Sequence, residues 1–183
     1  MGKDRLRIAT KEDAPAYLQL IQEAFQEVKD YGIDWPSTNA TLESVTENIE
    51  TGIALVLERD GRLISTITIR QPWESETPIS NYPFLWWFAT ANDYRGQGVG
   101  LKFLEQVEQE FLVNTLKAPG YVLGTSGKKH PWLLDMYLRN GFQVLATREN
   151  DDDLTVSLFK VLIPERFDDN ILRVEQAEFQ YQD

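Results

Sequence analysis

The chain has 183 residues with 42% apolar side chains, 18 Lys and Arg against 29 Asp and Glu, a formal net charge of −11, one His and no Cys. This composition fits one folded domain and excludes a disulfide framework, a thiolate zinc site and a cysteine nucleophile, and the acidic field disfavours nucleic acid and anionic membranes as partners. Because the chain has no Cys and one His, we expect it to bind no metal. We find neither an apolar run of about 20 residues nor a signal-peptide core, so we expect a cytoplasmic protein.

Two helices are predicted after a short opening strand. Thr10 and Asp13 have the spacing of a capping box, and apolar residues then recur every three or four positions over 17–28. The same spacing over 42–49 predicts a second, shorter helix, which Gly52 ends.

The hydrophobic period then changes to that of strands. Residues 53–58 and 63–70 are rich in β-branched side chains and flank Asp60-Gly61, which predicts a β-hairpin. Residues 71–83 contain three prolines and read as a loop. The apolar run FLWWFA that follows, residues 84–89, predicts a buried strand.

The second half alternates helices and strands. An apolar stripe from Leu101 to Phe111 predicts a helix, residues 121–126 a strand, and Pro131–Asn140 a helix that ends at Gly141. Residues 142–146 and 154–161 predict a final hairpin. The order β-α-α-β-β-β-α-β-α-β-β predicts an α/β domain over 1–163, a mixed parallel and antiparallel sheet flanked by helices, followed by an acidic extension over 164–183.

The segment FATANDYRGQGVG, residues 88–100, lies between a predicted strand and a predicted helix. Glycines allow a close approach of the backbone to a ligand, and the N–H groups at a helix start favour phosphate oxygens. A dinucleotide fingerprint would need a glycine where the chain has Leu101, and the Gly-Lys-Ser/Thr of a nucleotide-triphosphate loop is missing. We therefore interpret Gly96, Gly98 and Gly100 as parts of another kind of phosphate site.

Residues Arg95–Gly100 match the pattern Arg-x-x-Gly-x-Gly, and Tyr137 is followed four and five residues later by Gly141 and Phe142. Both features resemble signatures of the GNAT superfamily of N-acetyltransferases, and the resemblance extends from about Leu6 to Val161. It implies direct transfer of an acetyl group from acetyl-CoA to a primary amine without a covalent acyl-enzyme, which suits a chain that has no Cys.

The resemblance also implies roles for residues. Tyr137 would be the general acid that protonates the leaving thiolate of CoA. A backbone N–H of the preceding strand, that of Thr90 or of Phe88, would polarise the thioester carbonyl. Backbone N–H groups of the glycine loop would bind the pyrophosphate, namely those of Gly96, Gln97, Gly98, Val99, Gly100 and Leu101. The side chain of Arg95 would add positive charge.

Several assignments stay open at this stage. His130 stands where the family often has an Asn that contacts the cofactor, and it also suits a helix cap. Trp35 and Trp73 fall in predicted loops, where they either line an acceptor pocket or pack over a strand end. The general base that deprotonates the amine has five candidates: Glu74, Glu76, Asp93, Tyr82 and Glu58.

Two other functions compete with an acetyltransferase. A catalytically silent acyl-CoA-binding module is disfavoured by Tyr137, and a dinucleotide oxidoreductase by Leu101 and by the hairpins. The net charge of −11 favours a cationic amine as acceptor, with Glu74 or Glu76 pairing a second ammonium group. The resemblance further implies a homodimer as one form of the protein, and the extension could dock on the domain or on a second subunit.

Overall fold

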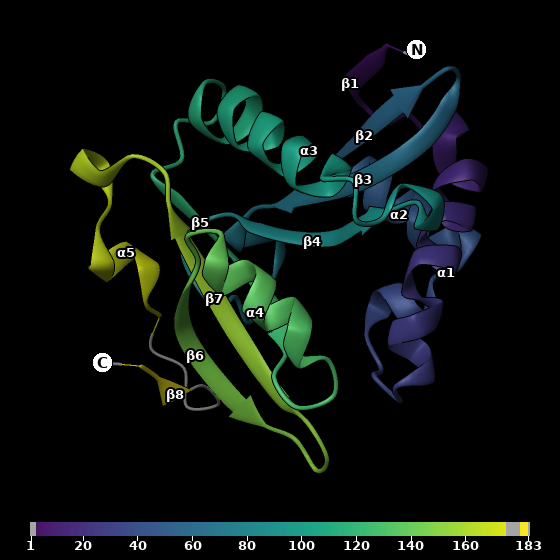
Figure 1. Ribbon diagram of the computed structural model, residues 1–183. Helices are drawn as coiled ribbons and strands as arrows, with labels where there is room; N and C mark the ends of the chain where they lie inside the picture. The colour runs from purple at the N-terminus through teal and green to yellow at the C-terminus, as the bar shows by residue number, and fades with distance from the viewer. Residues whose placement is uncertain (1–2, 175–179, 183) are drawn as a thin grey trace. The chain divides into compact units, whose positions relative to one another are not determined.

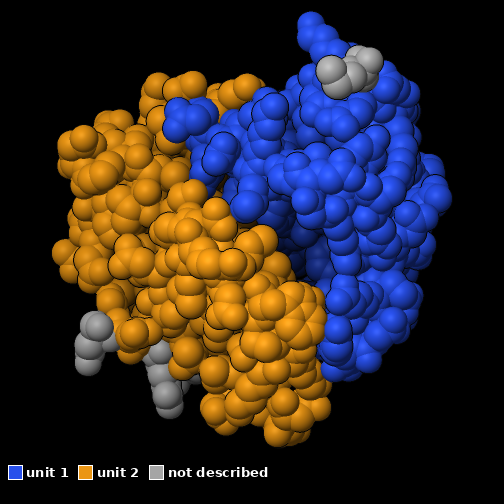
Figure 2. Space-filling view, in the orientation of Figure 1, with its two compact units in different colours: residues 1–69, 86–109 blue, residues 70–85, 110–183 orange. Residues whose placement is uncertain are grey.

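The computed structural model describes residues 3–174 and 180–182 of the chain. The fold is mixed α/β, as predicted, and it contains both antiparallel and parallel strand pairs. The chain forms two compact units, each made of two stretches of sequence: a first unit of Met1–Ile69 and Trp86–Gln109, and a second unit of Arg70–Leu85 and Glu110–Asp183 (Figure 2).

Strands of the first unit neighbour one another in the order β1-β2-β3-β4. The last residue of β3 and the first two of β4 already belong to the second unit. In Figure 1, β4 leads through a short turn into α3. The elements are β1 (Asp4–Ile8), η1 (Lys11–Asp13), α1 (Ala14–Asp30), η2 (Pro36–Asn39), α2 (Leu42–Thr51), β2 (Ile53–Arg59), β3 (Arg62–Arg70), β4 (Phe84–Thr90), η4 (Asn92–Tyr94) and α3 (Val99–Val107).

Local sequence signals account for the ends of these elements. Asp60 and Gly61 have φ angles of 51° and 77°, the left-handed pair that a two-residue hairpin turn requires. At the start of the first helical segment, the Asp13 carboxylate accepts a hydrogen bond from the Thr10 backbone N–H at 2.8 Å, as a capping box requires. Gly52 is the C-cap of α2, where the sequence predicted the helix to end.

The core of the first unit joins α1 and α2 to the strands. The predicted apolar stripe of α1 is buried, and each aliphatic side chain that is fully buried stabilises the fold by about 1.5–3 kcal/mol. The cluster therefore fixes both helices against β4, and its members include Tyr17, Leu20, Ile21, Ala24, Val45, Ile49, Ala54, Val56, Trp87 and Ala89.

Strands of the second unit follow the order β5-β7-β6-β8, with antiparallel neighbours throughout. Phe84, at the start of β4, pairs in parallel with Val122 of β5. Helix α4 packs against β5 (Figure 1). The elements are η3 (Pro72–Glu74), η5 (Glu108–Val113, a π-helix whose first two residues span the unit boundary), β5 (Gly120–Ser126), α4 (Pro131–Arg139), β6 (Gln143–Glu149), β7 (Leu154–Val161), η6 (Pro164–Arg166), α5 (Asp169–Leu172) and β8 (Gln180–Tyr181).

Two predicted elements differ from the structure in detail. The run FLWWFA forms β4 as expected, but the strand is not buried throughout, since its residues alternate between buried and half-buried. The apolar stripe from Leu101 to Phe111 runs through two kinds of helix, since the α-helix changes to a π-helix at Glu108.

The described part of the acidic extension packs on the second unit. Leu172 is fully buried, and the Tyr82 hydroxyl accepts a hydrogen bond from the Asp168 backbone N–H at 2.8 Å. Residues Gln180 and Tyr181 add a short antiparallel strand beside β6. The boundary at residue 163 stays a prediction, whereas docking of this segment on its own chain is observed.

Candidate active site

The glycine loop has the backbone that a phosphate site needs. Gly96 and Gly98 have φ angles of 75° and 76°, and a Cβ atom placed on either would meet no protein atom within 4 Å. Gly98 is the N-cap of α3, so the N–H groups of Val99, Gly100 and Leu101 have no partner within the helix. This exposed helix start favours an anion.

Gly100 has a different role from the other two glycines. A Cβ atom on it would lie 2.8 Å from Thr90 Oγ1 and 3.6 Å from the ring of Phe88. The Thr90 hydroxyl is itself 3.1 Å from Ser65 Oγ on β3. Gly100 therefore allows α3 to approach the end of β4, and the side chains of Phe88 and Thr90 face that helix.

Arg95 anchors the glycine loop to α1. Its guanidinium donates to the Glu27 carboxylate at 2.7 Å and to the Ala24 carbonyl at 2.8 Å. Gln97 Nε2 donates to the Asp93 carbonyl at 3.0 Å, which braces the loop from the other side. Direct contact of Arg95 or Gln97 with a cofactor stays a prediction, because both side chains already hold the loop.

A cavity of about 160 Å³ lies beside the loop. It has two basic side chains, Arg59 and Lys102, and one acidic group, Asp4, which pairs with Arg59 at 2.5 Å. Its remaining lining comes from the loop, α3 and β2: Leu57, Gln97, Gly98, Val99, Phe103 and Gln106. Basic groups and unpaired N–H groups thus gather at one place on a chain that is acidic overall.

Strand β4 contains an irregularity at Trp87. This residue has a φ of 52°, a left-handed conformation that costs about 1–3 kcal/mol for a residue other than glycine. Hydroxyl groups of β3 hold the strand there, since Thr66 Oγ1 donates to the Trp87 carbonyl at 3.0 Å and Ser65 Oγ to the Ala89 carbonyl at 2.7 Å. No local signal in the sequence predicts this feature.

A buried polar network lies against the same strand. Asn48 of α2 donates to Thr68 Oγ1 at 2.9 Å, and Thr68 Oγ1 lies 3.0 Å from the Tyr17 hydroxyl. Asn48 also accepts a hydrogen bond from the indole N–H of Trp86 at 2.9 Å. Burial raises the pKa of Tyr17 to about 12, so its hydroxyl stays protonated near neutral pH. The network fixes the position of the Trp86 ring.

Tyr137 lies on α4 in the second unit, with 5% of its surface exposed. Its ring packs edge-on against Phe142 at 5.0 Å between ring centres, which accounts for the spacing from Tyr137 to the Gly-Phe pair. Burial raises the pKa of Tyr137 well above its ordinary value of about 10. A phenol is protonated in the neutral range even at its ordinary pKa, and burial extends that range to higher pH.

Asp153 organises the loop between β5 and α4. Its carboxylate accepts a hydrogen bond from Ser126 Oγ at 2.7 Å and from the backbone N–H groups of Leu154, Lys128 and Lys129 at 2.8–3.3 Å. Burial alone would raise the pKa of Asp153, but these hydrogen bonds together lower it. This loop carries the start of the helix that bears the predicted acid.

His130 is buried at the N-cap position of α4. Its backbone N–H donates to Ser126 Oγ at 3.2 Å, and its ring centre lies 4.2 Å from that of Trp132. His130 thus occupies the cap position, but its side chain makes no capping hydrogen bond and is buried. Of the loop tryptophans, Trp35 packs edge-on against Phe25, whereas Trp73 is 79% exposed.

Most of the predicted general bases already have partners. Glu58 pairs with Arg7 at 2.9 Å, and the Arg62 guanidinium holds the pKa of Asp93 below its usual range. Glu74 accepts a hydrogen bond from the Gln71 backbone N–H, the Tyr82 hydroxyl accepts one from the Asp168 backbone N–H, and Glu76 is exposed. A single base is not distinguished by these contacts.

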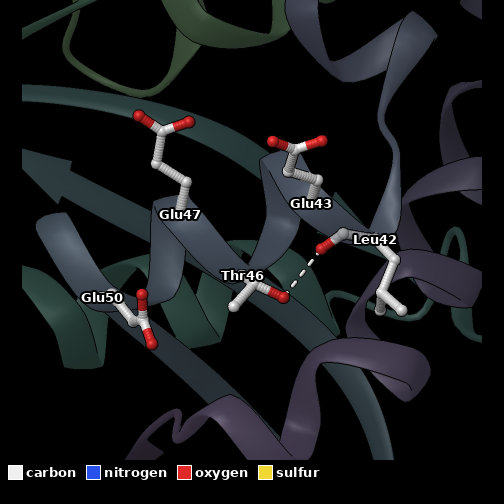
Figure 3. Close-up of a pocket in the computed structure, with 5 residues that line it drawn as sticks. All are labelled: Leu42, Glu43, Thr46, Glu47 and Glu50. Carbon is white, nitrogen blue, oxygen red and sulfur yellow. Dashed lines mark hydrogen bonds between the residues drawn. The ribbon is translucent and has the colours of Figure 1, made fainter.

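Helix α2 has an acidic outer face. Glu43 and Glu47 project from one side of the helix and Glu50 from another (Figure 3). The Thr46 hydroxyl donates a hydrogen bond to the Leu42 carbonyl. Within the part of the chain that the structure describes, no group of three or more His, Asp or Glu side chains could hold a metal ion. Likewise, none of the described helices is long and apolar enough to cross a bilayer.

Comparisons with known proteins agree with the sequence resemblance. Residues 50–144 match the family model of the acetyltransferase (GNAT) domain. The chain is 57% identical over 172 residues to S-alkylcysteine N-acetyltransferase of Bacillus subtilis, with 94% of this chain and 97% of that protein covered. It is 39% identical over 152 residues to S-(2-succino)cysteine N-acetyltransferase of the same organism, covering 83% and 89%.

A solved structure supports the fold. PaiA N-acetyltransferase of Thermoplasma acidophilum, in complex with coenzyme A, superposes with a TM-score of 0.66 at 17% sequence identity. The match covers 87% of this chain and 99% of that one.

Proposed function

Because the chain belongs to the GNAT family of acetyltransferases and is an N-acetyltransferase, we propose that it transfers the acetyl group of acetyl-CoA to the α-amine of an S-substituted cysteine. The observation that carries the acceptor class is the 57% identity to S-alkylcysteine N-acetyltransferase over nearly the whole of both chains. The second relative, which is named for S-(2-succino)cysteine, has an acceptor of the same class.

The glycine loop supports acetyl-CoA as the acyl donor. Left-handed glycines whose Cβ positions are empty leave room for a pyrophosphate against the backbone, and the N–H groups of Val99, Gly100 and Leu101 would donate to it. Lys102 and Arg59 add positive charge at the adjoining cavity. PaiA N-acetyltransferase, which has a similar fold, is in complex with coenzyme A, and this supports the proposal.

The chemistry assigns roles to two groups of the chain. A backbone N–H of β4, that of Phe88 or of Thr90, would donate to the thioester carbonyl as charge develops on its oxygen. The neutral amine forms the new C–N bond while the C–S bond breaks, and the amine nitrogen passes one proton to a general base or to water. Tyr137 would donate its phenol proton to the departing sulfur; a phenol is protonated at neutral pH, and burial raises the pKa of Tyr137 further.

This acceptor differs from the cationic amine that the net charge favoured. An S-alkylcysteine carries one ammonium and one carboxylate group, and S-(2-succino)cysteine carries two further carboxylates, so the overall acidic field gives neither a net attraction. Glu74, one of the two acids expected to pair a second ammonium, instead accepts the Gln71 N–H and lies 3.7 Å from Arg70. The proposal therefore rests on the relatives and not on charge.

A screen of acceptors tests the proposal. Release of CoA thiol would be measured with S-methylcysteine, S-benzylcysteine, S-(2-succino)cysteine, spermidine and a peptide amine, and the product would be identified by mass spectrometry. We expect the highest kcat/KM for an S-substituted cysteine. A higher value for spermidine would restore the cationic acceptor, and acetyl-CoA binding without thiol release from any amine would favour the silent module.

A further inference from the structure

Two tryptophans of β4 point to the same face of the strand. Successive side chains of a regular strand alternate between faces, so Trp86 would share the α3 face with Phe88 and Thr90. Instead its indole N–H reaches Asn48 on α2, and the Trp87 ring lies 6.3 Å from that of Tyr17 on α1. The left-handed backbone at Trp87 breaks the alternation and brings the two indoles into a stack at 5.2 Å.

The two indoles differ in what they offer a ligand. The N–H of Trp86 is already used by Asn48, so the partly buried ring presents carbon atoms at its remaining surface. Trp87 is 5% exposed, and among the described residues no group accepts a hydrogen bond from its indole N–H. A buried donor without an acceptor is uncommon and costs free energy in the absence of a ligand.

The pair is close to the reacting carbonyl that the proposed function assigns to β4. Phe88 is one residue and Thr90 three residues after Trp87. Their backbone N–H groups therefore lie roughly 3–10 Å from Trp87 along the strand. An amino-acid acceptor bears its carboxylate on the carbon that carries the reacting amine. Its carboxylate and its side chain must therefore lie near this part of β4.

We propose that Trp86 and Trp87 recognise the acceptor, with the Trp87 indole N–H donating to its carboxylate and the Trp86 ring packing against its apolar S-substituent. This inference rests on the proposed function and deepens it, because it states which atoms select an S-alkylated amino acid. Tyr17, Thr68 and Asn48 act as positioning residues, since they hold the Trp86 ring through hydrogen bonds.

The test compares two variants and two acceptors. Trp87→Phe and Trp86→Phe each replace one indole by a phenyl ring on the same strand, but only the first removes the N–H that lacks an acceptor. S-methylcysteine and S-methylcysteamine differ only in the carboxylate. We expect Trp87→Phe to lower the ratio of their kcat/KM values by roughly 10- to 100-fold, as for one hydrogen bond to a charged group, and Trp86→Phe to preserve it.

A second comparison tests the apolar contact. In the wild type, each methylene added to the S-alkyl chain should raise kcat/KM about fourfold until the site is full, which corresponds to burial of one CH₂ group. Trp86→Ala should flatten this series while Trp87→Phe leaves its slope in place. A slope that Trp86→Ala does not change would overturn the role of that ring.

The outcomes separate this inference from the proposed function. If the wild type acetylates no S-substituted cysteine, the proposed function fails; if it does so and Trp87→Phe keeps the ratio, only the role of Trp87 fails. Should Trp87→Phe not fold, the wild-type indole N–H can be followed by ¹⁵N NMR, assigned by elimination with variants of the other four tryptophans. A downfield shift with S-methylcysteine but not S-methylcysteamine supports the inference, and equal behaviour refutes it.

Discussion

Replacing Gly98 by alanine should separate cofactor binding from backbone strain, because the chain contains a matched control. Gly98 and Gly61 have φ angles of 76° and 77°, and a Cβ atom on either would meet no protein atom within 4 Å. Gly61 lies in the hairpin turn between β2 and β3, outside the glycine loop. The two substitutions therefore impose the same strain with different consequences for a ligand.

The magnitude follows from these geometries. Alanine in the left-handed region costs about 1–2 kcal/mol, so we expect both variants to lose a similar amount of stability. For a chain of this length that corresponds to a decrease in Tm of roughly 2–8 °C. Only the methyl group at position 98 occupies the space proposed for the pyrophosphate. Loss of one N–H to phosphate hydrogen bond should weaken acetyl-CoA binding roughly 10- to 100-fold.

Thermal unfolding and calorimetric titration with acetyl-CoA measure the two effects independently. Gly61→Ala should bind acetyl-CoA with wild-type affinity, while Gly98→Ala should not. Wild-type affinity in both variants would refute the assignment of the pyrophosphate to this loop. Equal loss in both would show that strain, and not obstruction, weakens binding.

Three further predictions concern other parts of the site. Tyr137→Phe should retain the stability and the acetyl-CoA affinity of the wild type, while its kcat falls by roughly 10²–10⁴-fold. The kcat of the wild type should show no loss from ionisation of the phenol until the pH exceeds about 10, because the pKa of Tyr137 is raised. Asp153→Asn should lower the free energy of unfolding by about 1–3 kcal/mol at pH 7. Because folding lowers the pKa of Asp153, this advantage of the wild type is complete above a pH of about 4 and disappears as the pH falls through the lowered pKa. Urea unfolding at several pH values measures the difference. Gly100→Ala should reduce Tm through its contact with Thr90, and acetyl-CoA affinity measured on the folded fraction should fall less than in Gly98→Ala.

Elements with a local cause could be predicted from the sequence. The Asp60-Gly61 turn, the N-terminal cap at Thr10 and the C-cap at Gly52 depend on residues next to one another, and the structure confirms each. The order of strands and helices follows from hydrophobic periodicity and is likewise confirmed. These signals suffice for the fold class because binary patterning is read within one element at a time.

Features with a tertiary cause were not visible in the sequence. Gly96, Gly98 and Gly100 form one motif, yet only the structure shows that Gly100 makes room for Thr90 while the other two adopt left-handed backbone. Arg95 fits the motif as a source of charge, but its guanidinium bonds α1, about 70 positions earlier in the chain. Motif spacing specifies residue types, and contacts between distant segments decide what each residue does.

The irregularity at Trp87 is the clearest instance of such a contact. Neither an aromatic residue nor its neighbours favour a left-handed backbone, so local preference opposes the conformation that the strand adopts. Buried hydroxyls of β3 bond the carbonyls of Trp87 and Ala89, and Asn48 holds the adjoining ring. Strain of this kind persists where surrounding contacts determine it, and such positions cluster at ligand sites. The irregularity also places two indole N–H groups side by side on one strand: that of Trp86, which has an acceptor, and that of Trp87, which has none among the described residues. Substitution of each ring in turn can therefore distinguish a structural role from a role in recognition.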